Sequence, residues 1–163
     1  MQKATIKTKL LTALLTLCML LSLMPMSAFA ADSTVSNEAE LTAALENANC
    51  SEIKLGGNIE TVKKLNVERT VTLDLNGYTL SRSSTNEDIV RVRSSGSLTI
   101  KDSGIGGKID GQNKNCGFDV NGGTLILESG SIVSCKTDGD GGAVDVSNTG
   151  VTETPIQYGK FIM

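Results

Sequence analysis

Residues 96–100 read Gly-Ser-Leu-Thr-Ile, and residues 123–127 repeat the pattern as Gly-Thr-Leu-Ile-Leu, 27 positions further along the chain. In both stretches an apolar residue recurs at every second position after a glycine, which predicts a short strand with one face buried. Residues 71–75, Val-Thr-Leu-Asp-Leu, lie 27 positions before the first stretch when Val71 is set against Leu98. A constant spacing between similar strands indicates a repeated structural unit.

Two further series of short apolar segments accompany the first. Val120 follows Val92 by 28 positions and Val146 follows Val120 by 26, and each ends a short apolar-x-Val motif. The other series consists of Gly-x-apolar motifs at residues 107–109, 130–132 and 159–161. Three strands in each period are typical of a solenoid, whose stacked coils enclose their apolar side chains. We therefore expect an all-β parallel β-helix of about four coils over residues 53–163.

Charged residues provide a check on this register, because the apolar alignment did not use them. The alignment sets Leu98 beside Leu125 inside the tube and places Asp74, Lys101 and Glu128 in one outward column that alternates in sign. Neighbouring strands lie about 4.8 Å apart, and opposite charges at that spacing contribute roughly 0.2–1 kcal/mol per pair. We expect this column to be a structural charge ladder.

The first 30 residues have the pattern of a signal peptide. Three lysines within the first nine residues precede an apolar run over residues 10–23, and Ala28-Phe29-Ala30 supplies a small-x-small cleavage site. The apolar run is shorter than the roughly 20 residues that span a membrane. We expect cleavage after Ala30, a secreted or cell-surface protein, and no membrane span in the mature chain.

A short helix is predicted directly after the cleavage site. Asn37 is a suitable N-cap, and Glu40, three residues later, completes a variant of the capping box. Apolar residues then follow at helical spacing, at positions 41, 44, 45 and 48. We expect residues 31–52 to form an N-terminal segment whose helix caps the β-helix.

The composition excludes several classes of function. The chain contains no histidine, which excludes Ser-His-Asp and Cys-His catalysis and histidine metal ligands. Removal of the signal peptide takes away three lysines and no acids, so the formal net charge changes from −3 to −6. Because the mature chain has no basic tract, we expect no nucleic-acid partner.

Three cysteines remain after cleavage, Cys50, Cys116 and Cys135. An odd number cannot form a disulfide framework by itself. One bridge with a leftover thiol and three free thiols are both open. The second alternative is favoured, because an isolated buried cysteine packs as a small hydrophobic residue.

One outward column contains residues that could carry chemistry. The inward Val-x-Val and Phe-x-Val pairs place Arg91, Asp119 and Asp145 side by side on the outer face. Carboxylates could hold Ca²⁺ or act as acid and base, and an arginine could meet an acidic sugar. Outward positions of a solenoid are polar by default, however, and an Arg91–Asp119 pair has a stabilising role. We assign these three residues as candidate ligand-binding residues and assign no catalytic residue.

We expect neither a metal nor a cofactor. Residues 138–142, Asp-Gly-Asp-Gly-Gly, are similar to the start of a calcium loop, but position 12 of such a loop would be Thr149 rather than a glutamate. A turn between strands, with glycines supplying positive φ angles, is the favoured interpretation.

The pattern resembles the right-handed parallel β-helix proteins of the pectate-lyase-like group, especially the secreted, adhesin-like repeat proteins of bacteria. The residues that carry this resemblance are the helix of 37–49 and residues 53–59, 73–80, 121–125 and 130–132. Because about four coils are too short a tube to wall a catalytic cleft, our leading interpretation is a secreted or cell-surface, non-catalytic, adhesin-like protein that binds a glycan or a partner protein. The alternative is a polysaccharide lyase or glycoside hydrolase relative that acts on acidic polysaccharide, because the group contains enzymes as well.

The repeat pattern weakens towards the C-terminus. Residues 152–163 lack the Gly-Thr-Leu-Ile-Leu pattern, and we see no capping element after the last motif at 159–161. An unpaired last coil would expose backbone donors and acceptors. We expect a β-helix that is truncated at this end or completed by end-to-end association with another chain.

Overall fold

Three parallel sheets wind around a common core in the computed structural model, which describes residues 32–138, 141–149 and 156–163. Sheet A contains β1 (Ser33–Val35), β2 (Glu52–Leu55), β5 (Thr70–Asp74), β8 (Ser97–Lys101), β11 (Thr124–Leu127) and β14 (Lys160–Ile162). Sheet B contains β3 (Ile59–Thr61), β6 (Thr79–Arg82), β9 (Lys108–Asp110) and β12 (Ser131–Val133). Sheet C contains β4 (Leu65–Val67), β7 (Asp88–Arg93), β10 (Cys116–Asn121) and β13 (Val144–Ser147).

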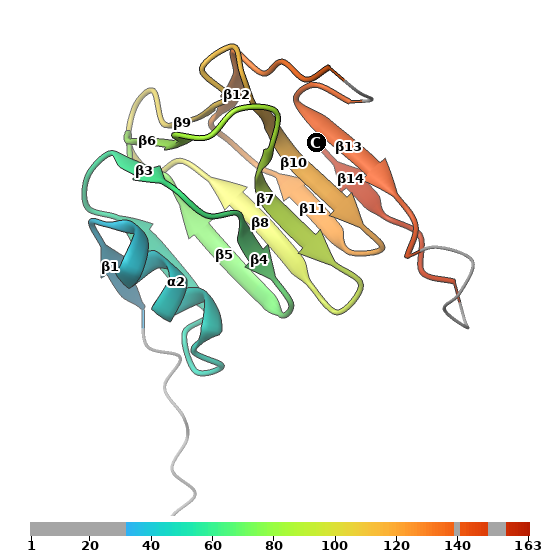
Figure 1. Cartoon of the computed structure of the whole chain (residues 1–163). Coiled ribbons are helices and arrows are strands. Elements are labelled where there is room, and N and C mark those ends of the chain that lie inside the picture. The colour runs from blue at the N-terminus through green and yellow to red at the C-terminus, as the bar shows by residue number, and fades with distance from the viewer. Residues whose placement is uncertain (1–31, 139–140, 150–155) are drawn as a thin grey trace, which may run out of the picture.

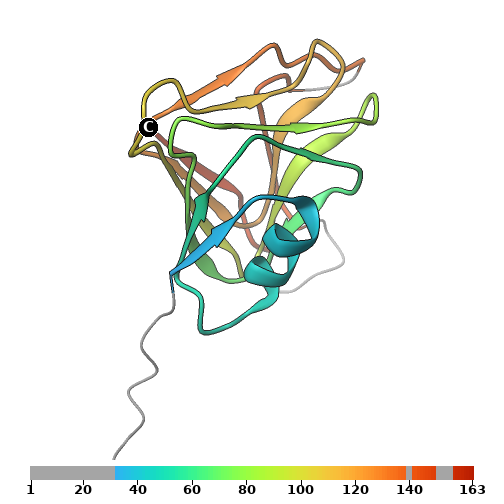
Figure 2. The ribbon, with the colours of Figure 1, turned by 90° about the vertical axis from the view of Figure 1, so that its left-hand side faces the viewer.

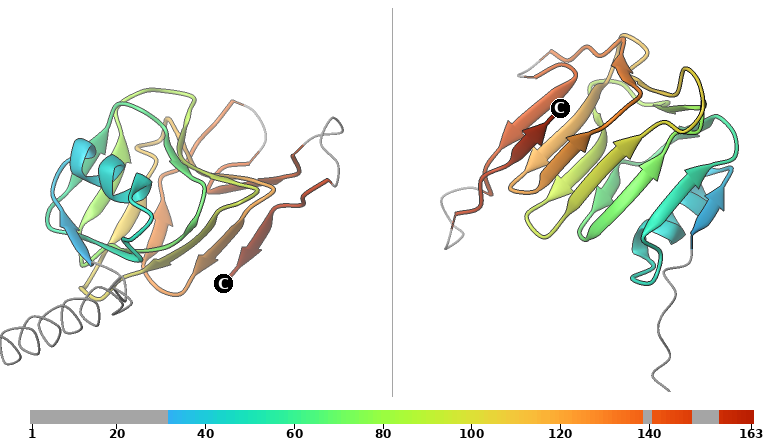
Figure 3. Two further views of the ribbon diagram at one scale, coloured as in Figure 1. Left: turned by 90° about the horizontal axis from the view of Figure 1, so that it is seen from below. Right: turned by 180° about the vertical axis from the view of Figure 1, so that it is seen from behind.

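Each coil contributes one strand to each sheet in the order A, B, C, and every strand pair is parallel. Four complete coils run from β2 to β13, with β1 before them and β14 after them. Figure 3, in its right-hand view, shows the strands of sheet A side by side from β1 to β14. The prediction of a parallel β-helix of about four coils is confirmed.

The apolar register is the one that the repeats predict. Leu98 of β8 lies between Val71 of β5 and Leu125 of β11. On sheet C, Phe118 lies between Val90 and Val144. These inward positions are buried in the first three coils, and Phe118 is the largest side chain that is wholly enclosed. The core of the tube is therefore a set of stacked apolar columns.

Helix α2 (Glu38–Glu46) lies across the N-terminal end of the tube, nearest the viewer in Figure 2. The Asn37 side chain accepts a hydrogen bond from the Glu40 backbone N–H, as expected for the N-cap, and Glu40 reaches back to the N–H of Ser36. Leu41, Ala44 and Leu45 join the core as the apolar spacing predicts, whereas Ala48 lies beyond the helix and is exposed. The helix therefore covers apolar side chains that the first coil would otherwise expose.

Arg69 fastens the other end of this helix to the first coil. Its Nε donates to the Leu45 carbonyl oxygen (2.8 Å) and its Nη2 to that of Ala44 (2.7 Å), while Nη1 donates to the Thr70 carbonyl oxygen (3.1 Å). The last carbonyls of a helix have no partner within the helix, and a cation there also faces the negative end of the helix dipole. We call this contact the Arg69 clasp.

The charge column on sheet A differs from the expected ladder. Asp74 does lie opposite Lys101, but Asp74 is buried, with 1% of its surface exposed. It pairs with Lys54 at 3.7 Å, and Lys101 pairs with Glu52 at 2.8 Å. Glu128 follows β11, and its backbone N–H donates to the Ile100 carbonyl oxygen. The pKa of Lys101 is raised, chiefly by its side-chain hydrogen bond with Glu52 and in part by the charge of Glu128.

The burial of Asp74 has a cause at the corner between sheets A and B. Its Oδ1 accepts the backbone N–H groups of Asn76 and Ser103, each at 2.9 Å. Burial alone would raise the pKa of Asp74, but hydrogen bonds from the Ser103 side chain and from these two N–H groups, with Lys54 nearby, hold that pKa below its ordinary value. In the next coil Asp102 accepts three backbone N–H groups in the same way. Both carboxylates therefore stabilise turns, and that of Asp74 is withdrawn from the solvent.

The C-terminal coil corrects one prediction. The motif at 159–161 does not form a sheet B strand, because Phe161 pairs with Leu125 and β14 continues sheet A. The glycine decides this position: a Cβ on Gly159 would overlap the Val120 carbonyl, just as one on Gly123 would overlap that of Arg93. Both glycines stand directly before a sheet A strand, where another backbone segment approaches too closely for a Cβ.

Core side chains of the last coil are less enclosed than those before them. Leu127, Ile132, Val144 and Phe161 are half-buried, whereas the equivalent positions of the preceding coil are buried. Association at this end stays a prediction. The predicted signal peptide, residues 1–30, lies outside the described residues, as do 139–140 of the Asp-Gly-Asp-Gly-Gly turn and residues 150–155.

The three described cysteines are free thiols. Cys50 and Cys116 are buried and Cys135 is half-buried. Burial raises the pKa of Cys116 to about 11 and also raises that of Cys135, so both thiols are protonated at neutral pH. Within the described ranges, no helix has the length and apolar character needed to cross a membrane.

Candidate functional site

The three candidate residues of sheet C occupy one row across neighbouring strands. Arg91 of β7 lies opposite Asp119 of β10, which lies opposite Asp145 of β13. Asn66 of β4 extends the row by one coil on the other side of Arg91. The parallel register, set by inward valines and Phe118, therefore brings together residues that are 26–28 positions apart in sequence.

Arg91 is held by two carboxylates. Its Nε donates to Oδ2 of Asp119, and its Nη2 lies 3.5 Å from Oδ2 of Asp88. Asp119 is 6% exposed, and the Arg91 side chain retains 32% of its accessible surface. The guanidinium is thus used mainly within the protein, and the Asp119 carboxylate is almost completely withdrawn from solvent.

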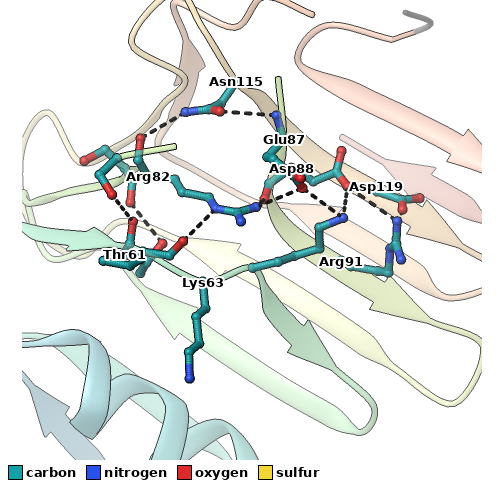
Figure 4. A network of polar contacts seen from close by, with 12 residues as sticks. Thr61, Lys63, Arg82, Glu87, Asp88, Arg91, Asn115 and Asp119 are labelled. Carbon is teal, nitrogen blue, oxygen red and sulfur yellow. Dashed lines mark hydrogen bonds and ion pairs between the residues drawn. The ribbon is translucent and has the colours of Figure 1, made fainter. Parts of the chain in front are cut away.

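The network extends to residues that the sequence reasoning missed (Figure 4). Lys64 Nζ lies 2.6 Å from Asp88 Oδ2, and the buried Arg82 donates from Nη1 to the Asp88 carbonyl oxygen (2.6 Å) and lies 3.4 Å from Glu87 Oε2. Lys64 and Glu87 directly precede strands, and Arg82 and Asp88 are terminal residues of strands, where alternation gives no reliable rule for side-chain direction. The concentration of opposite charges just before β4 and β7 was the one available signal.

Asn115 ties this network to the corner between sheets B and C. Its side chain is buried, donates to the Arg82 carbonyl oxygen (2.9 Å) and accepts from the Glu87 backbone N–H (3.3 Å). A buried amide that is satisfied on both sides fixes the positions of the groups it joins. Arg82 and Glu87 are consequently held in place before any ligand binds.

The chemistry that this row can perform is limited because its charged groups are paired with one another. A general acid and base need carboxylates that can exchange protons with a substrate. The oxygens of Asp119 and Asp88 are instead engaged by guanidinium and ammonium groups of the protein itself. Asp145, at the end of the row, is half-buried.

A groove lies beside this network, between helix α2 and β4. It has a volume of about 590 Å³. Its lining residues are Thr42, Leu45, Glu46, Lys63, Lys64, Leu65, Asn66, Glu68 and Arg69. Lys64 belongs both to the groove and to the ion-pair network, so the two features are continuous.

Lys63 lies on the helix side of this groove. Its side chain is exposed, and Figure 4 shows it pointing away from the network, towards α2. Its backbone N–H and that of Val62 both donate to the Glu38 carboxylate, at 2.8 and 3.1 Å. Those two hydrogen bonds, together with the Lys63 charge, lower the pKa of Glu38. Glu38 therefore fixes the turn after β3 against the first turn of the helix.

A model of the pectate lyase-like adhesive domain matches residues 32–125. The chain belongs to this family. The match covers the cap helix, the groove, Arg91 and Asp119 of this adhesive domain, whereas Asp145 lies beyond it. No curated protein and no solved structure matches this chain. Within its described residues, no group of three or more acidic or cysteine side chains could hold a metal ion.

Proposed function

We propose that this protein is a non-catalytic adhesion module that is exported from the cell and binds a glycan or a partner protein of a neighbouring surface. The binding surface is the groove between α2 and β4 together with the adjoining row of sheet C. Membership of an adhesive-domain family supports action outside the cell or at its surface. The proposal also includes the three candidate ligand-binding residues, Arg91, Asp119 and Asp145.

The closed Arg91 network is the observation that favours adhesion over catalysis. A lyase or hydrolase acting on an acidic polysaccharide would use an arginine free to meet a sugar carboxylate and carboxylates free to move protons. Arg91 and Asp119 are instead paired with each other, and Asp88 holds Arg91 from a second side. A rigid, preorganised polar face is suited to binding, because little side-chain freedom remains to be lost.

The test uses the mature chain, residues 31–163, on an array of neutral and acidic glycans and on polygalacturonate in solution. We expect retention on a subset of the arrayed glycans, or on a protein-coated surface, without release of new chain ends from polygalacturonate. The double variant Lys63→Glu with Asn66→Asp alters the groove without changing the core and should weaken retention. If the double variant is retained as strongly as the wild type, the binding surface lies elsewhere on the molecule.

The alternative, a lyase or hydrolase relative, predicts a different result in the same solution assay. Polygalacturonate is incubated with and without Ca²⁺. If it is cleaved above the blank by the wild type and by Lys63→Glu but not by Asp119→Ala, the protein is an enzyme and the adhesive function is rejected. Because Asp119 also stabilises sheet C, the variant must first be shown to unfold cooperatively. Asp145→Ala, in a less enclosed position, serves as the second variant.

A further inference from the structure

The N-terminal layer of the tube is incomplete on one side. β1 supplies the sheet A strand of this layer by pairing with β2, and α2 replaces the strands that sheets B and C would otherwise receive. On sheet B, the Glu38 carboxylate takes up the two N–H groups that follow β3. On sheet C the order of strands ends at β4, and in the described chain no strand pairs with its outer edge. The groove occupies this position.

The backbone of Asn66 faces the groove. A Cβ on Gly96 of the next coil would overlap the Val67 carbonyl, so that carbonyl points towards β7 and β8. Successive residues of a strand direct their N–H and C=O groups to opposite sides of the ladder. The N–H and C=O of Asn66, one residue earlier, therefore point to the open edge. An unpaired edge of this kind is a template for another extended chain.

The side chains of the groove add a charge preference. The amines and guanidinium of three basic residues and the carboxylates of two acidic ones line it. Arg69 is used in the clasp, Lys64 pairs with Asp88, and Glu68 pairs with Arg93 at 3.1 Å. Lys63 and Glu46, in contrast, are exposed and form no ion pair within the described residues, and Figure 4 shows Lys63 pointing away from the network. An acidic side chain on the incoming chain is the complement of this amine.

We infer that the groove binds an extended peptide segment of a partner protein, which adds as a strand to the free edge of β4 and sets an acidic side chain against Lys63. The inference rests on the proposed adhesive function and narrows its partner to a protein. Backbone hydrogen bonds to Asn66 supply affinity, and Lys63 supplies selectivity, as in other cases of strand addition. The helix α2 forms the second wall of the site.

The test selects binders to the mature chain from a phage-displayed library of short linear peptides. We expect selected peptides to contain an acidic residue within an extended, proline-free core. Asn66→Pro removes the N–H at the edge, and an edge strand tolerates proline where the N–H faces solvent. This variant should weaken binding by about tenfold or more, whereas Asn66→Thr, which keeps the N–H, should bind normally. Lys63→Glu should reverse the preference from acidic to basic peptides.

A second measurement keeps the test decisive if Asn66→Pro lowers stability. Methylation of single backbone nitrogens along a selected peptide should abolish binding at alternate positions, because only alternate N–H groups face β4. Strand addition would be overturned if the selected peptides bound Asn66→Pro as tightly as the wild type and if the methylated peptides bound the wild type as tightly as the unmethylated ones. Glycan retention on the array without any selected peptide would leave the adhesive function standing and reject this inference, whereas the absence of both would reject the two together.

Discussion

The buried carboxylate of Asp74 offers the sharpest test of how the coils are held together. In Asp74→Asn the side chain keeps its shape and an oxygen that can still accept from Asn76 and Ser103, but it loses its charge. Hydrogen bonds to a charged group contribute roughly 1.5–3 kcal/mol each and neutral ones roughly 0.5–1.5 kcal/mol. The two bonds together should therefore lose about 2 kcal/mol of unfolding free energy.

The partner lysine provides the matched control. Lys54 lies 3.7 Å from Asp74, and its side chain is 41% accessible, so the ion pair itself should contribute less than about 1 kcal/mol. Lys54→Gln should thus cost much less than Asp74→Asn in urea-induced unfolding of the mature chain. Equal losses in the two variants would show that the ion pair, and not the backbone N–H groups, accounts for the effect.

The pH dependence gives an independent reading of the same contact. Because the folded state holds the pKa of Asp74 below its ordinary value of 3.8, the stabilisation is complete above that value. It is lost as the pH falls through the lower, folded-state pKa. The difference in unfolding free energy between the wild type and Asp74→Asn should therefore shrink when the pH is taken from neutral to strongly acidic. A difference that stays constant over this range would refute the reasoning.

Three further predictions concern the corners, the core and the thiols. Gly123→Ala should lower the free energy of unfolding, measured in urea, by about 2–3 kcal/mol, because the new Cβ would overlap a backbone carbonyl. Gly57→Ala, which has open space around the Cβ, should leave that free energy nearly unchanged. Equal effects of the two substitutions would contradict the corner geometry. Phe118→Ala should lower the free energy of unfolding by about 3–5 kcal/mol in the same assay, because the ring is wholly enclosed. A loss of free energy below about 1 kcal/mol would show that the ring lies outside the core. In native protein a maleimide reagent should modify the half-buried Cys135 before the buried Cys116, and a disulfide found between them by mass spectrometry would contradict the free thiols.

The repeats were sufficient to predict the register of the tube. Leu98 and Leu125, and Val92 and Val120, pair as their spacings indicate, because inward positions must be apolar in every coil. The same logic predicted that Arg91 lies opposite Asp119. What periodicity cannot supply is the sheet to which a Gly-x-apolar motif belongs. Phe161 was assigned to sheet B and lies in sheet A, because glycine is needed at more than one corner.

Residues at strand ends were the least predictable from sequence. Alternation places Asp74 outside, but the chain bends at this corner and its carboxylate turns towards backbone N–H groups of two coils. Lys64 precedes β4 and Asp88 begins β7, and their contact depends on how two corners of successive coils meet in space. The groove could not be predicted either, because it arises where a helix replaces two strands of the first layer.

The Arg69 clasp has a mechanical consequence for a protein that holds surfaces together. In a solenoid each repeat is stabilised only by its neighbours, so disassembly starts where a terminal repeat is held least firmly. Two hydrogen bonds from the Arg69 guanidinium and two to the Glu38 carboxylate must break before the helix can separate from the first coil. Under tension these four hydrogen bonds should therefore keep the helix seated on the tube, and the groove beside β4 would keep its shape until they break.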